Sequence, residues 1–220
     1  MRAVDGVIQE LRDSLFRMGG RAEAILEKAM RGVWERDVAL AREVERDDLE
    51  IDRLDIEIDH LVLKALALQA PVAKDLRGVL AIKMMATDIE RVGDLARNIA
   101  KCAQRLSQNE AVPLPAALTG LARSSQRLFR NALDAYSRGD TELARMVLDE
   151  DDEVDDVEAE VVRSIIRELE AHPEAASQEV DLIMVAKHLE RVADHATNIA
   201  EDVILVAEAR NVKHASKLGG

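Results

Sequence analysis

Apolar residues recur along this chain at the three- and four-residue spacing of helices that bury one face. Ile89, Val92, Ala96 and Ile99 form one such stripe, and comparable stripes occur along most of the sequence. Proline and polar clusters interrupt the pattern, notably at Pro71 and in the segments around Pro113 and Pro173. The pattern and its breaks predict six helices, over roughly 4–34, 37–68, 72–108, 115–137, 140–170 and 174–211.

The second half of the chain repeats the first. The string ERVGDLARNIA at 90–100 returns as ERVADHATNIA at 190–200, with eight of eleven positions identical. A second match joins 37–57 to 140–160, and a repeat of about a hundred residues indicates a duplicated domain instead of a solenoid. We therefore predict an all-α fold of two tandem antiparallel three-helix bundles related by internal duplication. The predicted units are 1–110 and 111–212, with a disordered tail at 213–220.

Acidic pairs keep their places in both copies. Glu90 and Asp94 lie four residues apart, so they stack on one helix face, away from the apolar stripe and at or near the surface. Like charges at this spacing cost a helix a few tenths of a kcal/mol unless a cation offsets them. Each half has two such pairs on consecutive helices, which we expect to be neighbours. The pairs are Asp48 with Asp52, Glu90 with Asp94, Asp151 with Asp155, and Glu190 with Asp194.

Basic residues of the chain could neutralise these rows, and Arg97 and Lys187 each lie three residues from an acid. Their repeat equivalents are Thr197 and Thr87, however, so the basic residues change between the copies while the acids stay. That favours a bound metal over conserved ion pairs. Carboxylates without a thiolate suit Mg, Mn, Ca or iron and are tolerated by zinc. Asn98 and Asn198 continue the rows and are additional candidate ligands.

Composition narrows the classes of partner. Thirty Lys and Arg against 43 Asp and Glu give a net charge of −13, which disfavours nucleic acid and favours a cation or a basic protein surface. The single cysteine, Cys102, excludes an intrachain disulfide. We find no signal peptide and no apolar run long enough to cross a bilayer, so we expect a cytoplasmic protein that does not insert into membranes.

Several of these strings together resemble the PhoU family of phosphate-specific transport accessory proteins. They are PVAKDLR at 71–77, DIERVGDLARNIAK at 88–101 and HLERVADHATNIAE at 188–201, with the two Asp-x-x-x-Asp pairs. The resemblance covers roughly residues 5–210. It implies two tandem three-helix bundles with multinuclear surface metal clusters, of iron or zinc, held by the eight acidic residues named above. Mg and Mn remain compatible with these oxygen ligands.

The resemblance also implies a function. It indicates a negative regulator of the phosphate-starvation response and of phosphate uptake, which acts between the ATPase subunit of a phosphate ABC transporter and a membrane sensor histidine kinase. We expect a homodimer and no catalysis. The alternative is a helical-bundle oxidase with a carboxylate-bridged dinuclear metal, but such sites need two Glu-x-x-His pairs and only Glu57 to His60 has that spacing.

Three further residues carry expectations of their own. His188 and His195 have Asp88 and Leu95 as their repeat equivalents, so neither is a repeated ligand and both are expected at the surface. Trp34 is expected to cap the core or to lie at an interface.

Overall fold

The computed structural model describes residues 3–213, with side chains from Asp5 onward, and this part of the chain contains helices and no strand. Of the expected tail at 213–220, residues 214–220 lie outside the described residues, whereas Lys213 is described and lies 3.1 Å from Asp202. The helices are α1 (Ala3–Glu35), α2 (Val38–Gln69), α3 (Ala73–Ser107), α4 (Ala116–Arg138), α5 (Thr141–Asp149), α6 (Asp151–Ala171) and α7 (Ala176–Glu208), with a short 3₁₀ helix η1 (Pro173–Ala175) before α7.

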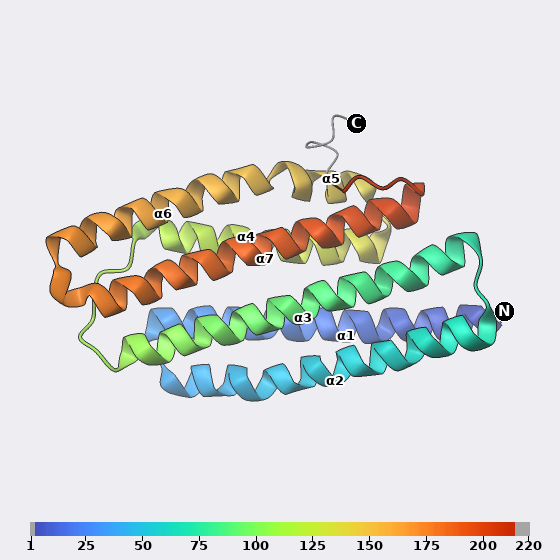
Figure 1. Ribbon diagram of the computed structural model, residues 1–220, viewed down its shortest axis with the longest axis horizontal. Coiled ribbons are helices and arrows are strands. Elements are labelled where there is room, and N and C mark those ends of the chain that lie inside the picture. Colours follow the sequence, from blue (N-terminus) through green and yellow to red (C-terminus); the bar gives the residue numbers. More distant parts are fainter. Residues whose placement is uncertain (1–2, 214–220) are drawn as a thin grey trace.

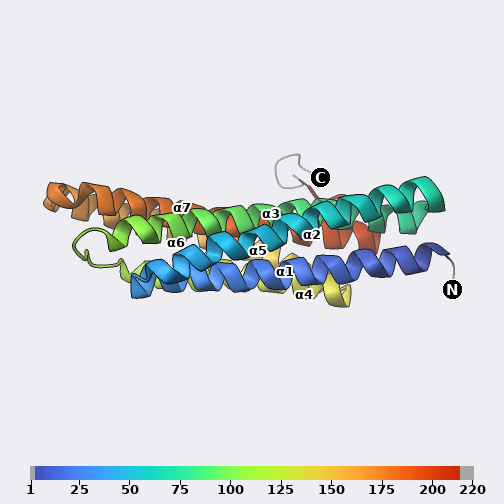
Figure 2. The same cartoon turned by 90° about the horizontal axis from the view of Figure 1, so that it is seen from below.

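The prediction of two tandem three-helix bundles is confirmed. α1, α2 and α3 form the first bundle, and α4, the α5–α6 pair and α7 form the second. All run along the long axis of the molecule, with α3 and α7 side by side at the centre and α2 and α6 at opposite edges (Figure 1). The view from below places α1 and α4 in a second layer (Figure 2). The boundary that we predicted between 110 and 111 falls in the connector between α3 and α4.

Two repeated aspartates begin corresponding helices. Asp37 accepts hydrogen bonds from the backbone N–H groups of Ala39 and Leu40, at 2.7 and 3.3 Å. Asp140 does the same for Glu142 and Leu143, at 3.1 and 3.0 Å. Such caps satisfy N–H groups that have no partner inside the helix.

The prediction of one helix over 140–170 is wrong, because the chain breaks at Glu150 into α5 and α6. Acidic residues occupy every position from Asp149 to Glu153. A new helix beginning at Asp151 places three of them in a first turn, where the helix dipole favours negative charge. Arg127 of α4 also holds Glu150, at 2.9 Å. The first half has Arg46 and Leu49 at the equivalents of two of these acids, and α2 is unbroken there.

The buried apolar residues of both halves form one continuous cluster. The halves meet mainly where α3 packs against α7, with a smaller contact of α1 with α4. Asp88 contacts His195 and Arg105 contacts Asp181, so sequence numbers rise along α3 as they fall along α7, and the two helices are antiparallel. No helix in the described part is both long and apolar enough to cross a membrane.

Candidate functional site

The first candidate site lies between α2 and α3, where an arginine joins the two acidic pairs. Arg97 Nη1 lies 2.5 Å from Asp48 Oδ2, and Arg97 Nη2 contacts Asp94 Oδ1. Arg91 lies 3.5 Å from Glu90 and 3.3 Å from Asp94. The expected i+3 pair of Arg97 with Asp94 is therefore present, and the same guanidinium reaches across to the neighbouring helix. Positive charge of the chain itself already compensates this acidic row.

Asp48 is only 1% exposed, so the expectation that every acid of the rows lies at or near the surface is wrong at this position. The cause is Gly93, which faces Asp48 from α3. A Cβ added at Gly93 would lie 2.8 Å from Asp48 Oδ1, so the missing side chain leaves the space that the carboxylate occupies. Burial raises the pKa of Asp48, Arg97 opposes that rise, and the charges of Asp52 and Asp94 add to it.

The second candidate site lies between α6 and α7 and has no such cation. Among residues 5–213, no Lys, Arg or His forms an ion pair with Asp151, Asp155, Glu190 or Asp194. The expected pair of Lys187 with Glu190 is absent, because Lys187 Nζ lies 3.1 Å from Glu158 instead. Thr197, the equivalent of Arg97, donates its hydroxyl to the backbone oxygen of Asp194 at 2.7 Å.

Burial and neighbouring carboxylates raise the pKa values of acids at the second site, and the charge of Lys187 opposes the rise at Asp155 and Glu190. Burial, followed by the charges of Asp194, Asp155 and further acids, raises the pKa of Asp151 to about 6. The pKa values of Asp155 and Glu190 are raised for the same reason, first by burial and then by Asp194. One oxygen of Asp151, Oδ1, is buried and has no hydrogen-bond partner. Groups of this kind are stabilised by a bound cation.

The fit to a metal differs between the sites. Both offer carboxylate oxygens, the donors that hard cations prefer. Within 3–213, no three His, Cys, Asp or Glu side chains converge closely enough to hold an ion as they stand. At the second site an orphaned oxygen fits a cation, and a bound ion would draw the repelling carboxylates together. At the first site a metal would compete with Arg97. The eight acidic ligands therefore stay a prediction.

The two candidate asparagines are not equivalent. Asn198 Nδ2 donates to Asp88 Oδ1 at 3.0 Å, so its amide nitrogen is used between the halves. Asn98 is half-buried on α3. His195 Nδ1 lies 2.8 Å from the same Asp88 oxygen, and His188 is only 8% exposed, so the expectation that both histidines lie at the surface is wrong. Burial, Arg191 and Arg105 lower the pKa of His188.

The sequence did contain a signal for this interface. Position 88 changes to His at 188, and position 95 changes from Leu to His at 195, so two positions seven residues apart differ together between the copies. In an antiparallel pairing of the repeated helices, 88 faces 195 and 95 faces 188. These two differences between the copies thus lie on the helix faces that meet at the α3–α7 contact, where Asp88 contacts His195.

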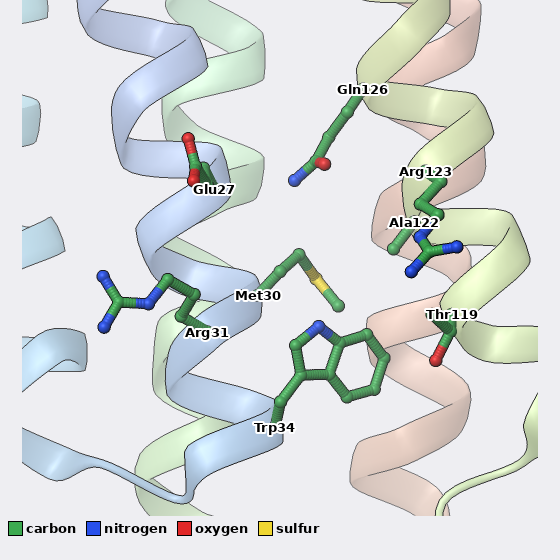
Figure 3. Close-up of a pocket in the computed structure, with 8 residues that line it drawn as sticks. All are labelled: Glu27, Met30, Arg31, Trp34, Thr119, Ala122, Arg123 and Gln126. Atoms are coloured by element: carbon green, nitrogen blue, oxygen red, sulfur yellow. The ribbon is translucent and has the colours of Figure 1, made fainter.

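The groove between α1 and α4 contains a pocket of about 370 Å³. Figure 3 shows the indole of Trp34 and the side chain of Met30 between the two helices, with Arg31 and Arg123 on either side. Trp34 is half-buried and packs against the core, which agrees with the expectation that it caps the core. The lining mixes acidic, basic and apolar groups and presents no single chemistry.

The Glu-x-x-His pair of the alternative reading lies outside the apolar core, with Glu57 at the edge of α2 that faces α1. Glu57 is about half exposed and accepts hydrogen bonds from Ser14 and Arg17, each at 2.7 Å, while His60 is exposed. Neither side chain faces the interior of the bundle, where a dinuclear oxidase site would need its ligands.

Comparisons with known proteins agree with this architecture. The PhoU domain model matches twice, at 15–103 and 118–203. The chain is 35% identical to a phosphate-specific transport system accessory protein PhoU homolog of Xylella fastidiosa, over 94% of this chain and 87% of the relative, and 31% identical to the Pseudomonas aeruginosa homolog, over 94% and 86%.

Two solved structures extend the agreement to the fold. The crystal structure of PhoU from Pseudomonas aeruginosa superposes with a TM-score of 0.91 at 30% identity, covering 94% of this chain and 99% of that one. The phosphate transport system regulatory protein PhoU from Streptococcus pneumoniae gives 0.87 at 24% identity, over 94% and 98%. With two matched domains spanning both bundles, this chain belongs to the PhoU family.

Proposed function

We propose that this protein is a cytoplasmic negative regulator of the phosphate-starvation response and of phosphate uptake. It acts as a metal-binding adaptor between the ATPase subunit of a phosphate ABC transporter and a membrane sensor histidine kinase. The observation that carries this proposal is the pair of PhoU domains over nearly the whole chain, shared with relatives whose names describe accessory proteins of phosphate-specific transport.

The chemistry of the described residues supports binding over turnover. Burial raises the pKa of the Cys102 thiol to about 11, with Arg105 opposing that rise, so the thiol stays protonated at neutral pH. A protonated, buried thiol is a poor nucleophile. The acidic rows instead offer charge and metal-binding oxygens, which suit a surface that recognises ions or basic partners.

Complementation tests the regulatory proposal. In a strain that lacks its own PhoU protein and carries a phosphate-responsive reporter, we expect this chain to restore repression in phosphate-rich medium. It should co-purify with the transporter ATPase or the sensor kinase under the same conditions. Persistent reporter activity despite normal protein levels would contradict the proposal, and metal-dependent oxidase activity of the purified chain would favour the enzyme alternative.

The proposed homodimer has a candidate surface on α2. Leu49, Ile56 and Leu63 are 53%, 56% and 64% exposed and follow one another at seven-residue spacing, so they form a stripe on a single helix face. We call these three residues the α2 stripe. Two copies of α2 packed antiparallel about Ile56 would place Leu49 of one copy beside Leu63 of the other, as a two-fold interface requires.

The proposed metal is iron or zinc, and Mg or Mn are further metals that bind carboxylate oxygens. Elemental analysis of the chain purified without an affinity tag tests this part by itself. A preparation with no bound iron, zinc, manganese or magnesium that also fails to bind them when they are added would contradict it, while leaving the regulatory proposal to the complementation assay.

A further inference from the structure

The two candidate sites share their acidic residues and differ in the charge that the chain supplies to them. We infer that they are unequal metal sites: Arg97 is a built-in cation that occupies the first, whereas the second, at Asp151, Asp155, Glu190 and Asp194, takes a hard metal ion from solution with the higher affinity. This inference rests on the metal binding proposed above and ranks its two sites.

At the first site a metal must displace an existing partner. Arg97 contacts Asp48 and Asp94, and Asp48 is 1% exposed. Removing a cation from a buried carboxylate is costly unless the incoming ion replaces every contact. The guanidinium would also remain nearby, since it is tethered to α3, and would repel the incoming cation. Arg91 adds a second positive charge beside Glu90 and Asp94.

At the second site the same position holds no charge. Thr197 replaces Arg97, and its hydroxyl bonds to its own helix. The nearby cation Lys187 forms its ion pair with Glu158 and none with the four acids. The buried Oδ1 of Asp151 therefore has no partner. A metal entering here displaces no protein cation.

A neighbouring acid on α6, Glu158, has a protein cation on one of its two carboxylate oxygens, since Lys187 Nζ lies 3.1 Å from Glu158 Oε2. Glu158 follows Asp151 and Asp155 on one helix face, its side chain is 7% exposed, and its Oε1 has no hydrogen-bond partner. Its first-half equivalent, Asp55, accepts from Lys83 at 3.1 Å, and Lys83 also holds Asp59. Both of these flanking acids thus have a lysine, and the sites differ in the row itself, where Arg97 and Arg91 form ion pairs at the first site and no cation of residues 5–213 does so at the second.

The chain offers a matched pair of swaps that test the inference. Thr197→Arg supplies the second site with the arginine of the first, and Arg97→Thr gives the first site the threonine of the second. Metal-stripped full-length protein would be titrated with Zn²⁺ and with Mn²⁺ by calorimetry, and bound metal per chain measured after dialysis. Arg97→Lys is the control, because it keeps a positive charge at the first site.

We expect the parent to show one tighter class of site and a class at least about tenfold weaker, a difference of about 1.4 kcal/mol. Thr197→Arg should remove the tighter class. Arg97→Thr should add metal bound tightly per chain, and Arg97→Lys should not. Arg97→Thr leaves Asp48 without its partner and could fold poorly for that reason alone. Thr197→Arg changes only a half-buried position on a helix face, so loss of the tight site in that variant is decisive by itself.

Other outcomes overturn the inference. Two sites of equal affinity in the parent, or unchanged tight binding in Thr197→Arg, would show that Arg97 does not distinguish the halves. Absence of any binding would overturn both this inference and the proposed metal, whereas repression in the complementation assay would still report on the regulatory proposal. If Thr197→Arg kept the parent's tight site and Arg97→Thr lost it, the first site would be the one with the higher metal affinity, and the ranking would be reversed.

Discussion

At the scale of single residues, the difference between the halves depends on two substitutions within one repeated string. Gly93 becomes Ala193, and Arg97 becomes Thr197. Because Gly93 has no side chain, the Asp48 carboxylate packs against the α3 backbone, where Arg97 neutralises its charge. Ala193 and Thr197 provide neither the space nor the charge. The two changes belong together, because a buried ionised carboxylate is costly unless a cation pairs with it.

Gly93→Ala tests the close approach of Asp48. A helix-interior Gly to Ala change ordinarily stabilises by up to about 1 kcal/mol, but here the new Cβ would lie 2.8 Å from Asp48 Oδ1. We expect Gly93→Ala to lower the melting temperature. Gly78→Ala on the same helix is the matched control, since a Cβ there meets nothing within 4 Å, and it should raise the melting temperature. Equal gains in both variants would show that Asp48 moves aside without cost.

Asp202 provides a prediction of pH dependence. It is fully buried on α7, and burial raises its pKa to about 6, while Lys213, 3.1 Å away, opposes the rise and the charges of Asp88 and Glu201 add to it. Because the folded-state pKa exceeds the unfolded value, the protonated acid favours folding. The contribution is present below about pH 4 and is lost as the pH rises through 6.

Asp202→Asn should remove that loss. Relative to the parent, the variant should gain free energy of unfolding between pH 4 and pH 7, by up to about 3 kcal/mol at about 1.4 kcal/mol per pKa unit. Urea unfolding at both pH values measures the difference. Asp156→Asn, at an exposed position of α6, is the control and should show no such gain. A parent and an Asp202→Asn variant with parallel pH profiles would contradict the prediction.

At the scale of elements, α2 and its second-half counterpart have diverged on their outer faces. The equivalents of Leu49 and Ile56 are Asp152 and Ala159, so the α2 stripe has no full copy on α6. An exposed apolar stripe on one of two repeated helices indicates a contact that only the first half makes.

Substituting the α2 stripe tests that contact. Leu49, Ile56 and Leu63 are each more than half exposed, so changing all three to Ser should leave the free energy of unfolding of the monomer nearly unchanged. We expect the variant to shift from dimer to monomer in sedimentation or light scattering. The control changes the exposed Met146, Ile166 and Val180 of the second half to Ser, and should keep the parent's mass. A monomeric parent would contradict the dimer proposal directly.

At the scale of the whole molecule, the halves form one body with unequal surfaces. A continuous core and the α3–α7 contacts at Asp88 and Arg105 join them. The first half combines an acidic row paired with Arg97 and Arg91 with the α2 stripe, and the second carries an acidic row that forms no ion pair with a cation of residues 5–213. Under our proposals, duplication has allowed one bundle to specialise in protein contact and the other in metal binding.

The amino-acid sequence alone determined the helices, their duplication and the positions of the acidic rows. Each follows from local periodicity, since the spacing of residues on a helix sets the angle between their side chains. The N-caps at Asp37 and Asp140 were readable for the same reason. The break at Glu150 was missed because the apolar stripe continues through it and only the adjacent acids signal a new start.

Only the tertiary structure decided which acids are neutralised. Arg97 meets Asp48 from 49 residues away, and His195 meets Asp88 from 107 residues away. Spacing along one helix places a side chain on a face, but its partner depends on how the neighbouring helix is rotated and shifted and on how closely the backbones approach. At Gly93 that approach buried an acid expected at the surface. The same acidic row is therefore an internal ion pair in one half and an open cluster of carboxylates in the other.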